Sequence, residues 1–100
     1  MNYDLASRAM VRMLSERVRL PYARSNPYEP TALPHLHHML VMIQSNPGWS
    51  DGKKGRWLGW VQACTTFMGL TTLDELKGLN QACACEDEGC PHYNTLHTHP

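Results

Sequence analysis

The stretch that decides the fold is Gly52–Gly69, GKKGRWLGWVQACTTFMG, which predicts one central helix. Basic residues lie in its first turns, Trp57 and Trp60 follow, and an apolar line continues to Met68. Gly69 is a natural residue to end the helix. Because unpaired backbone N–H groups at a helix start favour anions, the stretch brings cationic and aromatic groups to a place suited to an anion.

The polar and aromatic side chains of this helix form a candidate ligand site. Arginine offers a planar fork, lysine a point charge, tryptophan a stacking surface and glutamine an amide, so together they suit a nucleotide-like anion. In the alternative interpretation the tryptophans belong to the core, the lysines are solvated and Arg56 pairs with an acid such as Asp51. Trp57 and Trp60 diverge by about 60° of helical rotation, so one is expected inside and one near the rim. The candidate residues are Lys53, Lys54, Arg56, Trp57, Trp60 and Gln62.

The residues around the start of this helix add two expectations. Ser50 or Asp51 is suited to cap it, and Trp49 to pack against its first turn as a hydrophobic staple. Gly55 and Gly59 each cost about 1 kcal/mol relative to alanine inside a helix. We therefore expect close approach of another backbone at these glycines, or room for a ligand.

A first helix is predicted from about Asn2 or Tyr3 to Arg19, because apolar residues recur there at three- and four-residue steps. The segment Pro21–Pro30, PYARSNPYEP, holds three prolines and is predicted to be a connecting arm without helix. Tyrosines in this arm either pin it to the body of the protein or stack on a ligand or partner.

A second helix is predicted from a Thr31 N-cap to Asn46, with Pro34 in its first turn. His35 and His38 share one face of this helix at a spacing that a metal ion can bridge. Since no third ligand is adjacent, surface histidines are the alternative.

A capping box of Thr72 with Glu75 opens the fourth helix, which we expect to end near Gln81 to Cys83. Leu73, Leu76 and Leu79 are predicted to face inward. The fold is therefore predicted to be all-α, with a helical domain over residues 1–82 and an irregular Cys/His-rich tail over residues 83–100.

The tail lacks hydrophobic periodicity but carries possible metal ligands. Cys83, Cys85, Cys90 and His92 supply the four donors of a structural zinc site, and His97 or His99 can replace one of them. Free thiols and disulfides are the alternatives, and three clustered cysteines in a reducing cytosol favour metal over disulfides.

Composition limits the function classes. The chain of 100 residues is 42% hydrophobic, which suits one folded domain. Nine basic residues balance nine acidic ones, so nucleic acid is not an expected partner. Residues 1–60 hold eight basic and four acidic residues, whereas residues 61–100 hold one and five, and this polarity suits an anionic ligand or association of subunits. Without an apolar stretch near 20 residues or a signal pattern, we expect a cytoplasmic protein without a membrane partner.

No nucleophile motif, phosphate-binding glycine loop or zinc-protease motif is present, which indicates a non-catalytic protein. One segment, about a third of the chain, resembles a recurrent pattern in small proteins of tailed bacteriophages. The resemblance implies a phage gene product that acts in the cytoplasm of the bacterial host, and it implies no particular activity. The matching positions are Gly52, Lys53, Arg56, Trp57, Leu58, Gly59, Gln62, Thr72, Leu73, Asp74, Glu75, Leu76 and Asn80.

Three hypotheses follow from these patterns. The first is an accessory protein that counters a host defence by sequestering a small anionic, nucleotide-like ligand at the interface of a homo-oligomer. The second is a protein that binds and inhibits a host or defence complex, with Trp49, Trp60 and the arginines of the first helix as anchors. The third is a zinc-containing nucleic-acid module, which the neutral net charge disfavours.

Overall fold

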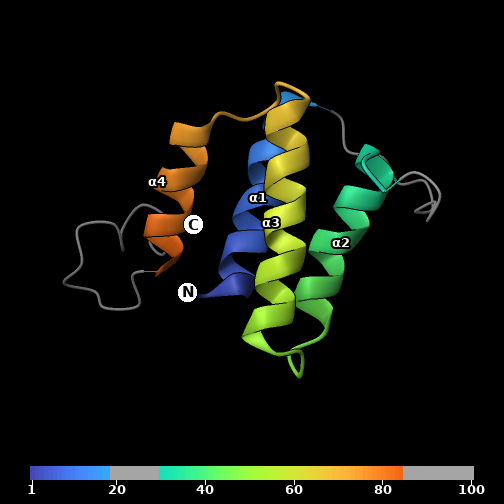
Figure 1. Cartoon of the computed structure of the whole chain (residues 1–100), viewed down its shortest axis with the longest axis vertical. Coiled ribbons are helices and arrows are strands. Elements are labelled where there is room, and N and C mark those ends of the chain that lie inside the picture. The colour runs from blue at the N-terminus through green and yellow to red at the C-terminus, as the bar shows by residue number, and fades with distance from the viewer. Residues whose placement is uncertain (19–29, 85–100) are drawn as a thin grey trace.

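The computed structural model describes residues 1–18 and 30–84, and within these parts the chain forms four α-helices and no strand (Figure 1). The helices are α1 (Tyr3–Arg17), α2 (Leu33–Ser45), α3 (Asp51–Phe67) and α4 (Leu73–Ala84). The predicted all-α fold with four helices is confirmed. The Pro-rich arm, apart from Pro30, and the tail from Cys85 onward lie outside the described residues.

Both ends of α3 are fixed by the residues that the sequence pointed to. Ser50 is the N-cap, and its Oγ accepts a hydrogen bond from the backbone N–H of Lys53 at 3.2 Å. At the other end Gly69 has a φ of +78°, a left-handed conformation that glycine adopts without strain. The Leu70 N–H then donates to the Thr65 carbonyl at 2.9 Å, which completes a Schellman ending.

The starts of α4 and α2 differ in how well they were predicted. The capping box of α4 is formed, with the Glu75 N–H donating to Thr72 Oγ1 at 3.2 Å and the Thr72 N–H donating to Glu75 Oε1 at 2.9 Å. The N-cap of α2 is Ala32, without a side-chain hydrogen bond, so the expectation of a Thr31 cap is wrong. Pro34 at the second helical position has no N–H to donate, which removes one reason for a side-chain cap there.

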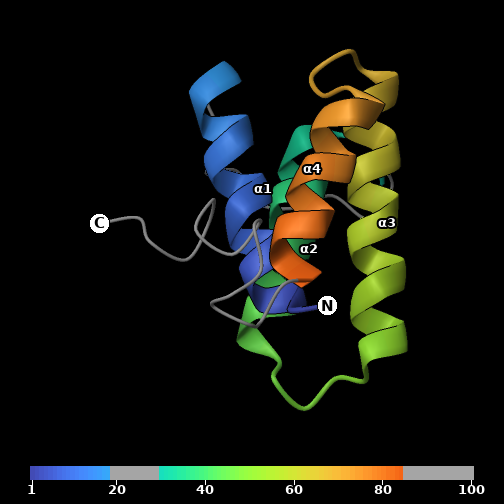
Figure 2. The ribbon, with the colours of Figure 1, turned by 90° about the vertical axis from the view of Figure 1, so that its left-hand side faces the viewer.

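The four helices share a hydrophobic core. α1 packs against the other three helices, and α3 packs against α1 and α2 (Figures 1 and 2). Leu76 and Leu79 of α4 face the core as predicted, but Leu73 is 64% exposed because it begins the helix beyond the packed layer. The buried core residues include Ala6, Met10, Leu14, Leu36, Leu40, Ile43, Leu58, Val61, Leu76, Leu79 and Cys83.

Candidate functional site

The six candidate ligand residues do not share one surface. Lys54 and Gln62 make contacts inside the helical domain, Lys53 and Trp57 join an aromatic cluster at the start of α3, and Arg56 and Trp60 face outward. Because consecutive helical residues differ by about 100°, three neighbouring cations on α3 necessarily point in different directions.

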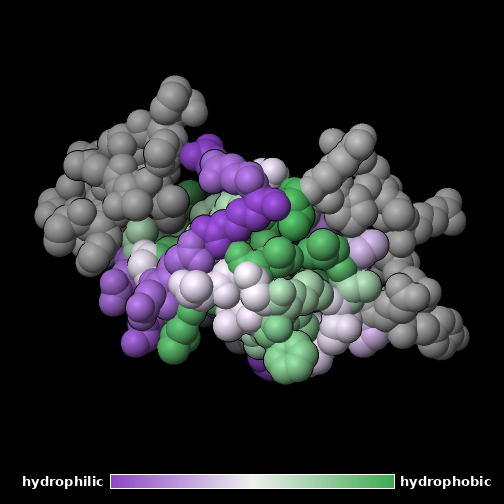
Figure 3. Space-filling view, turned by 90° about the horizontal axis from the view of Figure 1, so that it is seen from above, coloured by the Kyte–Doolittle hydropathy of each residue, from purple (hydrophilic) through white to green (hydrophobic). Residues whose placement is uncertain are grey.

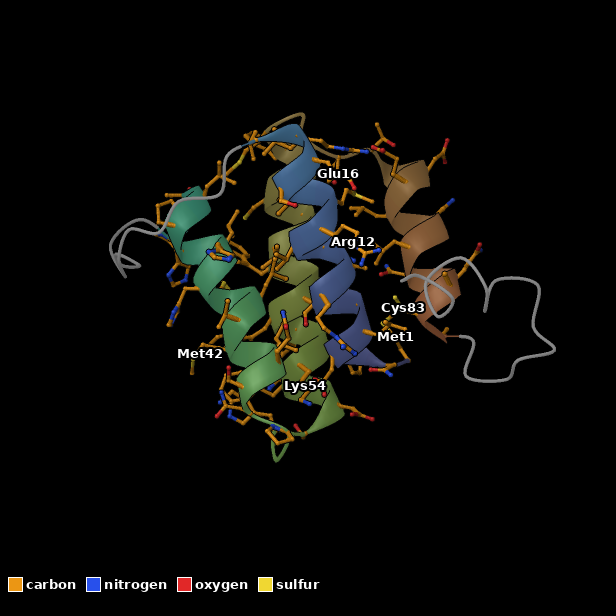
Figure 4. The ribbon with its side chains drawn as sticks, turned by 180° about the vertical axis from the view of Figure 1, so that it is seen from behind. Met1, Arg12, Glu16, Met42, Lys54 and Cys83 are labelled. Atoms are coloured by element: carbon orange, nitrogen blue, oxygen red, sulfur yellow. The ribbon has the colours of Figure 1, made fainter. Side chains whose placement is uncertain are left out.

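Lys54 forms an ion pair that joins α3 to α1. Its Nζ lies 3.0 Å from Asp4 Oδ1, and its side chain is only 8% exposed. Figure 4 labels Lys54 at the lower end of the bundle, on the side seen from behind. A buried ammonium needs a compensating partner, so the position that was predicted to bind a ligand is occupied by an internal contact.

Gln62 pairs with Asn80 of α4 through two amide hydrogen bonds. Gln62 Nε2 donates to Asn80 Oδ1 at 2.8 Å, and Asn80 Nδ2 donates to Gln62 Oε1 at 3.2 Å. Each amide therefore uses both its donor and its acceptor on the other, which ties α4 to α3. This reciprocal pair is the contact that the structure assigns to Gln62.

The start of α3 holds a self-contained cluster of two indoles and one ammonium. Trp49 and Trp57 meet edge to face with their ring centroids 4.6 Å apart. Lys53 Nζ lies 3.9 Å from the centroid of the Trp49 ring and 5.7 Å from that of Trp57. Trp49 thus lies near the helix start, but its apolar contact is Trp57, beyond the first turn, so the expected hydrophobic staple against the first turn is not formed. Trp57 is itself packed on the core.

The two helical glycines of α3 lie in unlike surroundings. A Cβ added to Gly55 would lie 3.1 Å from the Tyr3 hydroxyl oxygen and 3.3 Å from Tyr3 Cε1. Gly55 therefore allows the close approach of a side chain of α1, and not of another backbone as expected. A Cβ added to Gly59 would meet nothing within 4 Å, so this glycine leaves an open place on the outer side of the helix.

Arg56 and Trp60 remain exposed and lie one turn apart on α3. Trp60 is 44% exposed, and its indole Nε1 donates to the Pro30 carbonyl at 3.1 Å, which fixes the ring. Within the described parts of the chain Arg56 makes no ion pair, so the expected pairing with Asp51 is not found. The division into an inner Trp57 and an outer Trp60 agrees with their predicted divergence.

A continuous exposed row runs along α3, and we call it the outer face of α3. Only one of its six residues is charged, and Phe67 at its end is 95% exposed. Figures 1 and 2 show no other described helix on this side of α3. Phe67 was not among the predicted site residues, although its spacing of seven from Trp60 places the two residues on one face of the helix. The outer face consists of Gly52, Arg56, Gly59, Trp60, Ala63 and Phe67.

The apolar surface continues beyond the end of α3. Met68 is 40% exposed and Leu73 is 64% exposed, on either side of the turn that leads into α4. Figure 3, which looks onto this end of the molecule, shows apolar surface reaching the edge where α3 lies. The same end is braced by Arg17, which makes a two-pronged ion pair with Glu75 and donates to the Leu70 carbonyl at 2.7 Å.

Cys83, which we expected in the irregular tail as a zinc ligand, lies in a helix instead. It lies in the last turn of α4, is fully buried and belongs to the core, and burial raises the pKa of its thiol to about 11. Figure 4 shows it on the side of α4 that faces α1, and its carbonyl accepts from the Asn2 N–H at 3.1 Å. Packing is therefore the role that the structure gives Cys83. The other proposed ligands, Cys85, Cys90 and His92, lie outside the described residues.

Across residues 1–18 and 30–84, no three or more His, Cys, Asp or Glu side chains come together in a way that could hold a metal ion, the histidines of α2 included. None of the four helices is long and apolar enough to cross a membrane. Comparison with known proteins found no family model, curated protein or solved structure that matches the chain.

Proposed function

We propose that this is a non-catalytic protein that works by binding another polypeptide chain through the outer face of α3. The observation that carries the proposal is the exposure of Trp60 and Phe67 on one helix face with a single charge. Exposed apolar patches of this kind mark interaction sites, and tryptophan and arginine are the residues that most often dominate binding energy.

The geometry of Trp60 supports the same proposal. Its hydrogen bond to the Pro30 carbonyl holds the indole in one orientation while 44% of the residue stays exposed. A side chain that is already fixed loses little conformational entropy when a partner covers it. Arg56, one turn away, adds a cation that can bind a carboxylate of the partner.

A small anionic ligand is the second candidate, and Arg56 is the observation that favours it. Arg56 lies in the first turns of α3, near the positive end of the helix dipole, and its Nη1 lies 3.5 Å from where a Cβ on Gly52 would be. Four of the six residues predicted to bind this ligand are engaged within the protein, namely Lys53, Lys54, Trp57 and Gln62. We therefore rank protein binding first.

The proposed setting is a bacterial cell infected by a phage. The resemblance to small phage proteins supports this setting, and the partner is then either a phage-encoded chain, a second copy of this one included, or a host protein. A role in countering host defence follows from the same resemblance and is part of the proposal.

Site-specific photo-crosslinking tests the proposal. A photoreactive phenylalanine analogue replaces Ala63 on the outer face of α3 in one protein and Gln81, an exposed residue of α4, in the other. We expect a crosslink to a second polypeptide from position 63 and none from position 81. Equal crosslinking from the two positions, or none from position 63, would refute binding through this face.

The same protein preparation separates the second candidate. Thermal melts with cyclic and linear nucleotides are compared for the native protein and Arg56→Gln. Stabilisation that depends on Arg56, together with an absence of crosslinks from position 63, would favour the small ligand over a protein partner.

A further inference from the structure

From the outer face of α3 we infer that its partner is a second copy of this chain, bound with the two α3 helices antiparallel. The inference rests on the proposed function and names the chain that the face binds. It depends on three features of the face: the order of large and small residues, the position of its single charge, and the symmetry that follows from both.

Large and small residues alternate along the face in an order that fits itself. Gly59 and Ala63 are small and exposed, and a Cβ added to Gly59 would meet nothing within 4 Å, whereas Trp60 and Phe67 are large and exposed. If two copies of α3 run antiparallel and cross between Val61 and Gln62, position 60 of one helix faces position 63 of the other. Trp60 of each copy then enters the shallow place over Gly59 and Ala63 of the other, as a knob enters a hole.

In the same register, Arg56 has a contact in the second copy. Position 56 faces position 67, so the guanidinium of Arg56 meets the ring of Phe67 in the second copy, an arrangement favourable for a cation over an aromatic face. It also lies at the C-terminal end of the second α3, which is the negative end of the helix dipole and has no basic residue in its last turn.

A parallel arrangement loses these contacts. It would bring Arg56 against Arg56 and Phe67 against Phe67, so that the like charges repel and the cations lose their ring partners. In the antiparallel arrangement the same patch serves both copies, as in any two-fold interface, and Trp60 of each copy meets the small Ala63 of the other. The antiparallel arrangement also places the basic start of one α3 beside the end of the other α3, which has no basic residue in its last turn.

The size of the outer face of α3 determines the affinity that we expect for the dimer. A helix of 17 residues is about 25 Å long, which places the contact near the small end of specific interfaces. We therefore expect a reversible dimer that forms in the micromolar range rather than a permanent one. Met68 and Leu73, at the end of the face, are exposed and available to extend the contact.

Sedimentation equilibrium of the full chain tests the inference with matched variants. Gly59→Glu and Gly78→Glu both place a carboxylate at an exposed helical glycine with nothing within 4 Å of the new Cβ, on α3 and α4 respectively. Phe67→Ser is a third variant, and because Phe67 is 95% exposed its removal leaves the core intact. Circular dichroism verifies that each variant is folded.

We expect the native chain and Gly78→Glu to dimerise with dissociation constants within about twofold of each other. Gly59→Glu and Phe67→Ser should weaken the dimer by about a hundredfold, since each residue occurs twice in it and a central contact is worth about tenfold per copy. Dimerisation that is equal in Gly59→Glu and Gly78→Glu would overturn the inference, as it would show a different interface.

The test also separates this inference from the proposed function. A native chain that stays monomeric up to millimolar concentration, while position 63 crosslinks to a foreign protein, overturns the second-copy inference and leaves the proposed function standing. A monomer without any crosslink from position 63 removes both.

Discussion

Replacing a helical glycine by alanine should stabilise this protein at two positions and destabilise it at a third. Gly55, Gly59 and Gly78 are all inside helices, so replacement by alanine gives each the same intrinsic gain of about 0.5 to 1 kcal/mol in helix stability. What differs is the space that the new methyl group enters. At Gly59 and Gly78 it meets nothing within 4 Å, so the full gain should appear in the free energy of unfolding.

At Gly55 the methyl group enters occupied space. It would lie 3.1 Å from Tyr3 Oη, 3.3 Å from Cε1 and 3.4 Å from Cζ, closer than ordinary carbon contacts. Tyr3 is packed against the core, so its ring must shift by a few tenths of an ångström. Overpacking of this kind costs about 1 to 3 kcal/mol. We therefore expect Gly55→Ala to be destabilising by up to about 2 kcal/mol, net of the gain in helix propensity.

Urea denaturation followed by circular dichroism measures the three variants. The protein is used well below the micromolar dissociation constant of the inferred dimer, so that association does not contribute, and an unchanged m-value verifies that the unfolding transition is comparable. In a domain of this size a gain of about 1 kcal/mol raises the midpoint of thermal unfolding by about 4 to 8 °C. The reasoning fails if Gly55→Ala is as stable as Gly59→Ala, or if the gains at Gly59 and Gly78 differ by more than about 0.5 kcal/mol.

Three further predictions concern polar and ionisable groups. In urea melts, Asp4→Ala should lower the free energy of unfolding by about 1 to 3 kcal/mol, because it leaves the ammonium of Lys54 unpaired in a side chain that is only 8% exposed. Lys54→Met should lower it clearly less, because the Asp4 carboxylate that loses its partner is 41% exposed to water. The hydrogen bond and ion pair from Arg17 lower the pKa of Glu75 to about 2, so the stabilising charge of Glu75 is present above pH 4.5 and lost as the pH falls toward 2. In thermal melts, the native protein should therefore lose its stability advantage over Glu75→Gln, a variant that keeps the capping box, across that pH window. Cys64 and Cys83 should resist alkylation in the native protein and react in denaturant, because burial raises the pKa of both thiols; rapid native reaction of Cys83, followed by mass spectrometry, would contradict its place in the core.

The parts of the fold that the sequence predicted well are those set by local chemistry. The capping box at Thr72, the cap at Ser50 and the left-handed Gly69 each involve residues within five positions of one another. Such contacts form wherever the local sequence allows them. Periodicity likewise predicted the buried faces, and it failed at Leu73, where the pattern continues past the edge of the packed layer.

The candidate site was predicted less well because its contacts are not local. Lys54 pairs with a residue 50 positions away, and Gln62 pairs with one 18 positions away. A single sequence shows that cations and an amide are present, but the packing of α1 and α4 against α3 decides which of them are engaged inside the protein. The exposure of Phe67 is also set by non-local packing. No local sequence pattern shows which side of α3 is left without a neighbouring helix.

The distribution of apolar residues on α3 links the fold to the proposed dimer. Its inner side contributes Leu58, Val61 and the buried Thr65 to the domain, and its outer side carries Trp60 and Phe67. A helix that is apolar on both sides usually has neighbours on both sides. In one copy of the chain α3 has described neighbours only on its inner side (Figures 1 and 2). A second copy placed against the outer face would give α3 neighbours on both sides in a symmetric dimer, which is the position that its composition fits.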